Sequence, residues 1–185
     1  MKKQQAIASV RHWVESFIIR NNLCPFAGRE FLSDRIRFSY SNASSEPQLL
    51  DALTDELELL NHNLSIETTL LIHPEVLQDF YDYNQFLDQA ERLLEHLGLL
   101  GVYQIASFHP DYQFSGSSPE DAENYTNRSP FPLIHILREQ SVERAIMSHP
   151  DISTIPSKNI ALMNKLGSET LSKIMQRCLQ QGTNE

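Results

Sequence analysis

Residues 102–137 decide the fold of this chain, because they hold two predicted strands with no helix between them. The first strand reads VYQIASF (102–108) and the second reads PLIHIL (132–137), on either side of a loop. Both runs are short and rich in β-branched and aromatic residues, as strands are. Strands that lack a crossover helix need not be parallel, so we expect this pair to be antiparallel.

Two further strands precede this pair. IRFSY (36–40) alternates apolar and polar residues, as a half-buried strand does, and TTLLI (68–72) is more continuously apolar, as an inner strand is. Between them, leucines at helical spacing from residue 49 to residue 60 predict a helix, with Ser45 and Gln48 as its capping box. Such strand–helix–strand units favour parallel strands joined by right-handed crossovers.

The remaining patterns predict helices that cover a sheet. Apolar residues recur at helical spacing over 5–20 and 76–97, and three more helices are expected at 141–148, 155–166 and 168–180. No linker or repeat divides the chain. We therefore predict one α/β (or α+β) domain over residues 1–185, with a four-stranded mixed sheet and helices at its C-terminal end.

Composition restricts the partners. The net charge is −9 over 185 residues, with no run of Lys or Arg, so we expect no binding to nucleic acid or to anionic membranes. No stretch has the roughly 20 apolar residues of a membrane span, and the opening MKKQQ does not resemble a secretory signal. We expect a cytoplasmic protein whose two cysteines, Cys24 and Cys178, are reduced and unpaired.

The loop at 109–130, HPDYQFSGSSPEDAENYTNRSP, is the predicted functional region. Loops this long are uncommon in compact domains and are usually functional or disordered, and the aromatic content of this one disfavours disorder. It joins the end of one strand to the start of another. We therefore expect His109 and Arg128 on one side of the sheet, close enough to contact the same small ligand.

His109 and Asp111 are the candidate catalytic residues. An imidazole titrates near neutrality, and residues two apart on extended chain share a side, so Asp111 could orient His109 as a general base. The alternative is a hydrogen-bonded histidine that anchors the loop. The same pair could ligate a metal with His135 as the third ligand, but that set is short and we assign no metal.

Arg128 and its neighbours are the candidate ligand-binding residues. A stiff loop end with prolines at 130 and 132 suits bidentate contacts from arginine to a carboxylate or phosphate, with Tyr112, Asn127 and Ser129 as further polar contacts. The alternative is an internal ion pair between Arg128 and an acidic residue of the loop.

Cys24 and His135 are secondary candidates. Cys24 could act as a nucleophile, but Leu23 and Phe26 beside it favour a buried structural thiol. His135 lies within an apolar strand, which favours a hydrogen-bonded core histidine. Cys178 falls on an apolar helical stripe and is predicted to be core. The cofactor stays unassigned, because the six glycines form neither GxGxxG nor GxxxxGK, and no GxSxG is present.

Four segments carry a resemblance to a known family: LCPFA (23–27), ASFHPDYQF (106–114), NRSPFP (127–132) and ILRE (136–139). Together they resemble the signature motifs of a bacterial family of uncharacterised proteins, a domain of unknown function. The resemblance spans nearly the whole chain and implies a complete member of that family. It implies no activity and no catalytic residues.

Two hypotheses of function follow. In the first, the protein is an enzyme or a small-molecule-binding protein whose polar pocket, built from the 109–130 loop, takes an anionic ligand. In the second, it is a non-catalytic interaction module in which the loop aromatics Tyr112, Phe114, Tyr125 and Phe131 dock another macromolecule. A concave pocket containing His109 and Arg128 favours the first, and aromatic rings exposed on a flat or convex face favour the second.

Overall fold

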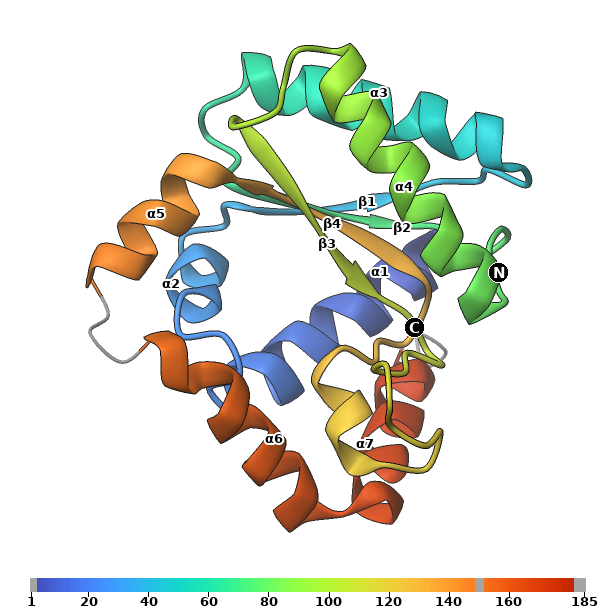
Figure 1. Cartoon of the computed structure of the whole chain (residues 1–185), viewed down its shortest axis with the longest axis vertical. Helices are drawn as coiled ribbons and strands as arrows, with labels where there is room; N and C mark the ends of the chain where they lie inside the picture. Colours follow the sequence, from blue (N-terminus) through green and yellow to red (C-terminus); the bar gives the residue numbers. More distant parts are fainter. Residues whose placement is uncertain (1–2, 149–151, 182–185) are drawn as a thin grey trace.

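The fold is built on a four-stranded mixed sheet in the order β1-β2-β4-β3 (Figure 1). The structure is a computed structural model that describes residues 3–148 and 152–181. The strands are β1 (Ile36–Tyr40), β2 (Thr68–Ile72), β3 (Tyr103–Phe108) and β4 (Leu133–Arg138). β1 and β2 are parallel, whereas β4 is antiparallel to both β2 and β3. The predicted α/β domain with a mixed sheet is confirmed, as is the antiparallel pair that the missing crossover helix indicated.

Two helices, α3 (Glu46–His62) and α4 (Phe80–His96), cover one face of the sheet (Figure 1). α3 forms the crossover from β1 to β2 that the leucine spacing predicted, and α4 connects β2 to β3. The residues buried between them and the sheet include Leu49, Leu53, Leu71, Tyr83 and Ile134. These positions repeat at helical spacing along the helices and at every second residue along the strands.

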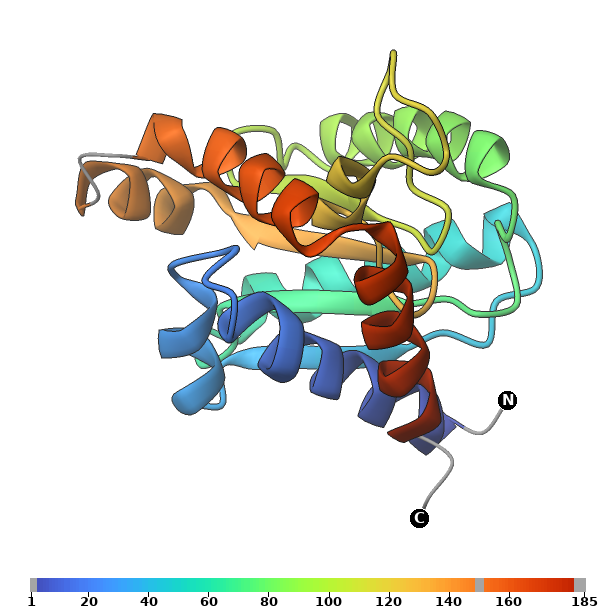
Figure 2. The same ribbon diagram turned by 90° about the horizontal axis from the view of Figure 1, so that it is seen from below.

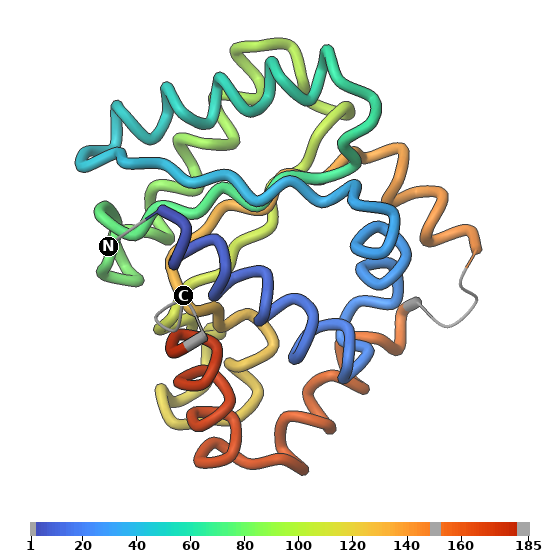
Figure 3. Tube along the Cα trace, turned by 180° about the vertical axis from the view of Figure 1, so that it is seen from behind, coloured from blue at the N-terminus to red at the C-terminus, as the bar shows by residue number. Residues whose placement is uncertain are grey.

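The other face is covered by elements from both ends of the described chain. They are α1 (Lys3–Trp13), the π-helical turn η1 (Val14–Ile19), α2 (Ala27–Leu32), α6 (Ile155–Leu166) and α7 (Ser168–Gln181). α1 and α7 pack against each other (Figures 2 and 3). Their shared core includes Val10, Phe17, Leu171 and Cys178, so the core position predicted for Cys178 is confirmed.

The last helix before the C-terminal pair, α5 (Glu139–Ser148), projects from the end of β4 (Figures 1 and 2). None of its residues is fully buried. It therefore depends on side-chain contacts with its neighbours rather than on a core of its own. No helix in the described ranges is long and apolar enough to cross a membrane.

Three local predictions need correction. The helix expected from residue 76 begins at Phe80, because the Asp79 carboxylate accepts the Tyr81 and Asp82 N–H groups as an N-cap. Ser45 makes no side-chain cap, since Gln48 instead accepts the backbone N–H of Ser44 at 2.9 Å. No helix was predicted between residues 20 and 36, yet the chain after Pro25 forms the short helix α2.

Candidate functional site

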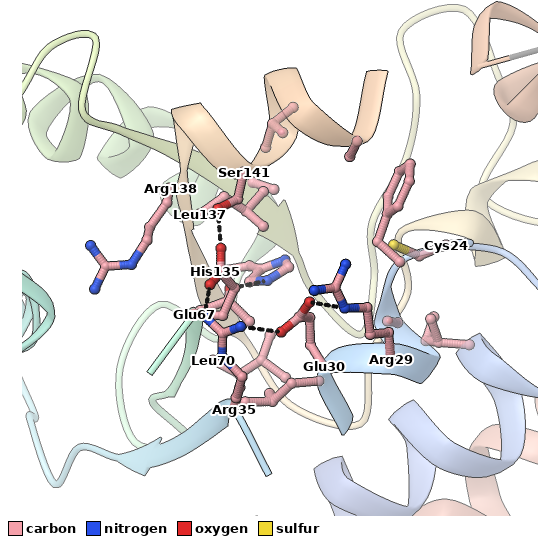
Figure 4. Close-up of a pocket in the computed structure, with 18 of the residues that line it drawn as sticks. Cys24, Arg29, Glu30, Arg35, Glu67, Leu70, His135, Leu137, Arg138 and Ser141 are labelled. Carbon is pink, nitrogen blue, oxygen red and sulfur yellow. Dashed lines mark hydrogen bonds and ion pairs between the residues drawn. The ribbon is translucent and has the colours of Figure 1, made fainter. Parts of the chain in front are cut away.

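A cavity of about 750 Å³ lies between the sheet and the elements α1, η1, α2 and α5 (Figure 4). Its floor is the sheet face that carries Thr68, Leu70, Ala106, Phe108 and His135. These residues share a face because alternate positions on a strand point the same way, and the register sets both Leu70 and Ala106 opposite His135. Three strands thus present one continuous lining.

Apolar side chains form most of the walls. Trp13 of α1 meets Phe108 edge to face, with 5.5 Å between the ring centroids. Further apolar lining comes from η1, the Pro25–Ala27 segment and α5. A cavity of this size with mostly apolar walls and a few polar groups is typical of small-molecule sites.

A chain of charged side chains lines one side of the cavity. Arg29 and Glu30 of α2 lie 3.6 Å apart, and Glu30 also lies 3.6 Å from Arg35, which precedes β1. Arg35 donates to the carboxylate of Glu67, the residue before β2. Figure 4 shows the four side chains as one connected series.

Glu67 continues this series to α5. Its carboxylate accepts the Ser141 hydroxyl and lies 3.8 Å from Arg144, while its side chain is only 11% exposed. A carboxylate this buried needs partners, and Glu67 has three: Arg35 just before β1, and Ser141 and Arg144 on α5. The series contains three arginines, Arg29, Arg35 and Arg144, against two glutamates. The cavity wall therefore carries a net positive charge in a chain whose net charge is −9.

Two of these arginines are accessible from solvent. The side chains of Arg29 and Arg144 are 82% and 62% exposed. Each guanidinium has five N–H donors and turns only some of them toward the largely buried carboxylate of Glu30 or Glu67, so donors remain for an anionic ligand. Arg138 also borders the cavity, but its guanidinium donates to the carbonyl of Leu60 in the last turn of α3 and to that of Ile66 before β2.

His135 stands in the floor of the cavity and is partly accessible from it. Its Nε2 lies 2.7 Å from the Thr68 hydroxyl, which itself lies 2.6 Å from the Ile136 carbonyl. Burial lowers the pKa of His135 to about 4, so the ring is neutral at pH 7. The hydrogen-bonded histidine expected from the sequence is present, and it faces the cavity.

Cys24 also lines the cavity, as a half-buried free thiol beside Pro25 and Phe26. Both secondary candidates from the sequence, Cys24 and His135, therefore border the same hollow (Figure 4). Cys178 is free as well and lies in the core. Its thiol pKa is raised by burial.

His109, the primary candidate, is fully buried on the opposite face of the sheet. Its ring packs against Tyr83 with 5.1 Å between centroids. Nδ1 accepts the Asp111 backbone N–H at 3.0 Å, so Nε2 carries the proton and donates to the Leu77 carbonyl at 3.2 Å. Burial lowers the pKa of His109. Asp111 thus meets His109 through its backbone, not through its carboxylate.

The expected third metal ligand does not join this pair. His135 lies on the cavity face of β4, whereas His109 packs against α4 on the other face. Across residues 3–148 and 152–181, no group of three or more His, Cys, Asp or Glu side chains could hold a metal ion.

Arg128 is occupied within its own loop. It donates to the Tyr112 carbonyl at 3.2 Å and to the Pro119 carbonyl at 2.6 Å, and it lies over the Tyr125 ring at 4.6 Å. Neither of the two sequence hypotheses foresaw this, because both gave Arg128 an anionic partner. The arginine instead ties the middle of the loop to its end.

The other loop candidates are also engaged inside the chain. Asn127 donates to the Ser107 carbonyl at 3.2 Å, and the Ser129 hydroxyl donates to the Phe131 carbonyl at 2.7 Å. Tyr112 packs against Phe80 and Phe114, with centroids 5.1 and 5.0 Å apart. No residue of the 109–130 loop lines the large cavity.

Sequence reasoning missed Asn124, which organises this loop. The side chain is fully buried; its oxygen accepts the Phe114 N–H and the Ser117 hydroxyl, and its amide donates to the Ser118 carbonyl. A lone Asn in a polar loop gives no periodic signal, so only the folded path of the loop reveals its role.

The chain belongs to the family described as protein of unknown function (DUF1415), whose model matches residues 5–173. The expected membership of a family of unknown function, over nearly the whole chain, is thereby confirmed. No curated protein and no solved structure matches the chain.

Proposed function

We propose that this protein binds a small organic anion with an apolar body in the cavity between the sheet, α2 and α5. The observation that carries the proposal is the combination of about 750 Å³ of mostly apolar lining with a net positive charge at one side. Pockets that enclose small molecules commonly measure about 300–1,000 Å³. The apolar walls suit the body of the ligand, and the exposed arginines suit its carboxylate or phosphate.

This proposal keeps the anionic ligand that the sequence suggested and moves the binding site. The 109–130 loop supplies no lining to the cavity, and its arginine is engaged with carbonyl oxygens. The loop aromatics do not favour the docking alternative either. Tyr125 and Phe131 are buried, and Tyr112 and Phe114 pack against each other.

We also propose a cytoplasmic location. Its support is the pair of unlinked cysteines, which are usual in a reducing compartment.

Calorimetric titration with a panel of aromatic and aliphatic carboxylates and phosphate monoesters tests the proposal. We expect at least one class of acid to bind the wild type, and Arg29→Gln to weaken that binding about tenfold, as the loss of a charge-assisted contact does. Arg177→Gln is the matched control, because it removes the same charge from an exposed position on α7 that does not line the cavity. Equal losses in both variants, or no binding by any acid, would reject the proposal.

A further inference from the structure

The centre of the cavity floor contains one histidine in an apolar setting. His135 is opposite Leu70 on β2 and Ala106 on β3, and the Phe108 ring lies 6.0 Å from its own. Among the described residues, Thr68 is the one hydrogen-bond partner of the His135 ring. A hydrogen bond to a polar atom in such a setting is stronger than the same bond in water, because the apolar surroundings have a low dielectric constant.

The hydrogen bonds of Thr68 fix which nitrogen of His135 carries the proton. The Ile136 carbonyl can only accept, so the single hydroxyl proton of Thr68 is directed to it at 2.6 Å. The Thr68 oxygen must then accept from His135, and Nε2, at 2.7 Å, is the donor. Because the ring is neutral at pH 7, its other nitrogen, Nδ1, is a bare acceptor.

Nδ1 receives no hydrogen bond from any residue in the described part of the chain, although His135 borders the cavity. The two other histidines of the sheet region differ in this respect. His109 uses both ring nitrogens inside the protein, and the free nitrogen of His73 is sealed in the core. His135 thus combines a fixed tautomer, an unused acceptor and access to a cavity.

We propose that the ligand of this cavity carries a hydroxyl or N–H group on its apolar body, and that Nδ1 of His135 accepts a hydrogen bond from it. The inference rests on the proposed function and narrows the ligand class to hydroxylated or N–H-bearing organic acids. The arginines at the side of the cavity bind the anionic group. His135 selects ligands whose apolar body carries a hydrogen-bond donor. Sites built to pair with a donor discriminate strongly against analogues that lack it, because the acceptor is left unpaired.

Matched probes test this selection. We would measure Kd by calorimetry for 4-hydroxyphenylacetate against 4-methoxyphenylacetate, and for indole-3-acetate against 1-methylindole-3-acetate. We expect the wild type to bind the donor-bearing member of a pair at least tenfold more tightly. His135→Phe should bind both members equally, since a phenyl ring suits the apolar surroundings but offers no acceptor.

Thr68→Val is the second variant, needed in case His135→Phe does not fold. Without the hydroxyl, the proton of His135 is no longer held on Nε2, so the preference within each pair should fall several-fold. If the wild type binds both members of each pair equally, or if His135→Phe keeps the preference, the donor proposal is overturned while the anion site stands. If none of these acids and no other acid binds, the proposed function itself fails, and the donor proposal fails with it.

Discussion

At the scale of single residues, the structure distinguishes side chains whose hydrogen bonds stabilise the fold from side chains that are available to a ligand. His109, Asn124 and Arg128 all have their hydrogen-bonding groups committed to the chain itself. Arg29, Arg144 and His135 border the cavity, and each has hydrogen-bonding groups left for a ligand. Residue type alone does not make this distinction, because histidine and arginine suit both roles.

We predict that Arg128→Ala destabilises the protein. The arginine donates to two loop carbonyls and stacks on Tyr125, and charge-assisted bonds of this kind together contribute about 1–3 kcal/mol. Urea denaturation should show that loss, and Arg128→Lys should recover only part of it, because an ammonium cannot match the planar fork. An unchanged or higher midpoint for Arg128→Ala would instead indicate an unpaired cation held for a ligand.

Two histidines with lowered pKa values, His73 and His135, make stability depend on pH. Burial lowers the pKa of both His73 and His135 to about 4. In the unfolded chain they take up protons near pH 6.5, so the unfolded state binds more protons between pH 6.5 and 4. Stability is therefore complete above about pH 6.5 and falls as the pH drops toward 4, by up to about 3 kcal/mol for each group.

Chemical denaturation between pH 7 and pH 4.5 measures this dependence. His135→Phe should reduce the slope of the free energy of unfolding against pH, because it removes one of the histidines whose pKa burial lowers. A slope identical to that of the wild type would show that His135 is not held neutral by burial.

At the scale of elements, the strands were the most predictable part of the fold and the helix ends the least. The run PLIHIL and the missing crossover were sufficient to predict β4 antiparallel to β3. By contrast, the stripe over 5–20 does not show that the helix widens into a π-helical turn at Val14. α2 was missed because six residues are too short to show a helical period.

α5 is the element whose position depends most on polar contacts. It has no fully buried residue, and the Glu67 carboxylate joins it to the sheet through Ser141 and Arg144. We predict that Glu67→Gln increases amide hydrogen exchange throughout α5 while α3 and α4 stay protected, because their cores are untouched.

Glu169→Gln is the control for this experiment. It removes a carboxylate from the exposed pair with Lys173 on α7, whose side chains are 85% and 62% exposed. Such a pair contributes little, so exchange in α5 should not change. Protection of α5 that is equal in Glu67→Gln and in the wild type would show that other contacts hold the helix.

At the scale of the whole molecule, the cavity could not be predicted from sequence because no single segment forms it. Its lining comes from α1, η1, α2, all four strands and α5, and its charged series joins residues from 29 to 144. The length and aromatic content of the 109–130 loop made it the predicted functional region. In the structure that loop connects β3 to β4, is held by hydrogen bonds within itself, and projects at one side of the molecule (Figure 2).

The central claim is that the cavity itself binds the ligand, and filling it is the most direct test. Ala106 lies in the floor opposite His135, so Ala106→Phe places a ring in the hollow without removing a buried partner. For an acid that raises the Tm of the wild type, we predict that Ala106→Phe abolishes the rise while its own ligand-free Tm is equal or higher. A folded Ala106→Phe protein that keeps the full ligand-induced rise in Tm would contradict the claim.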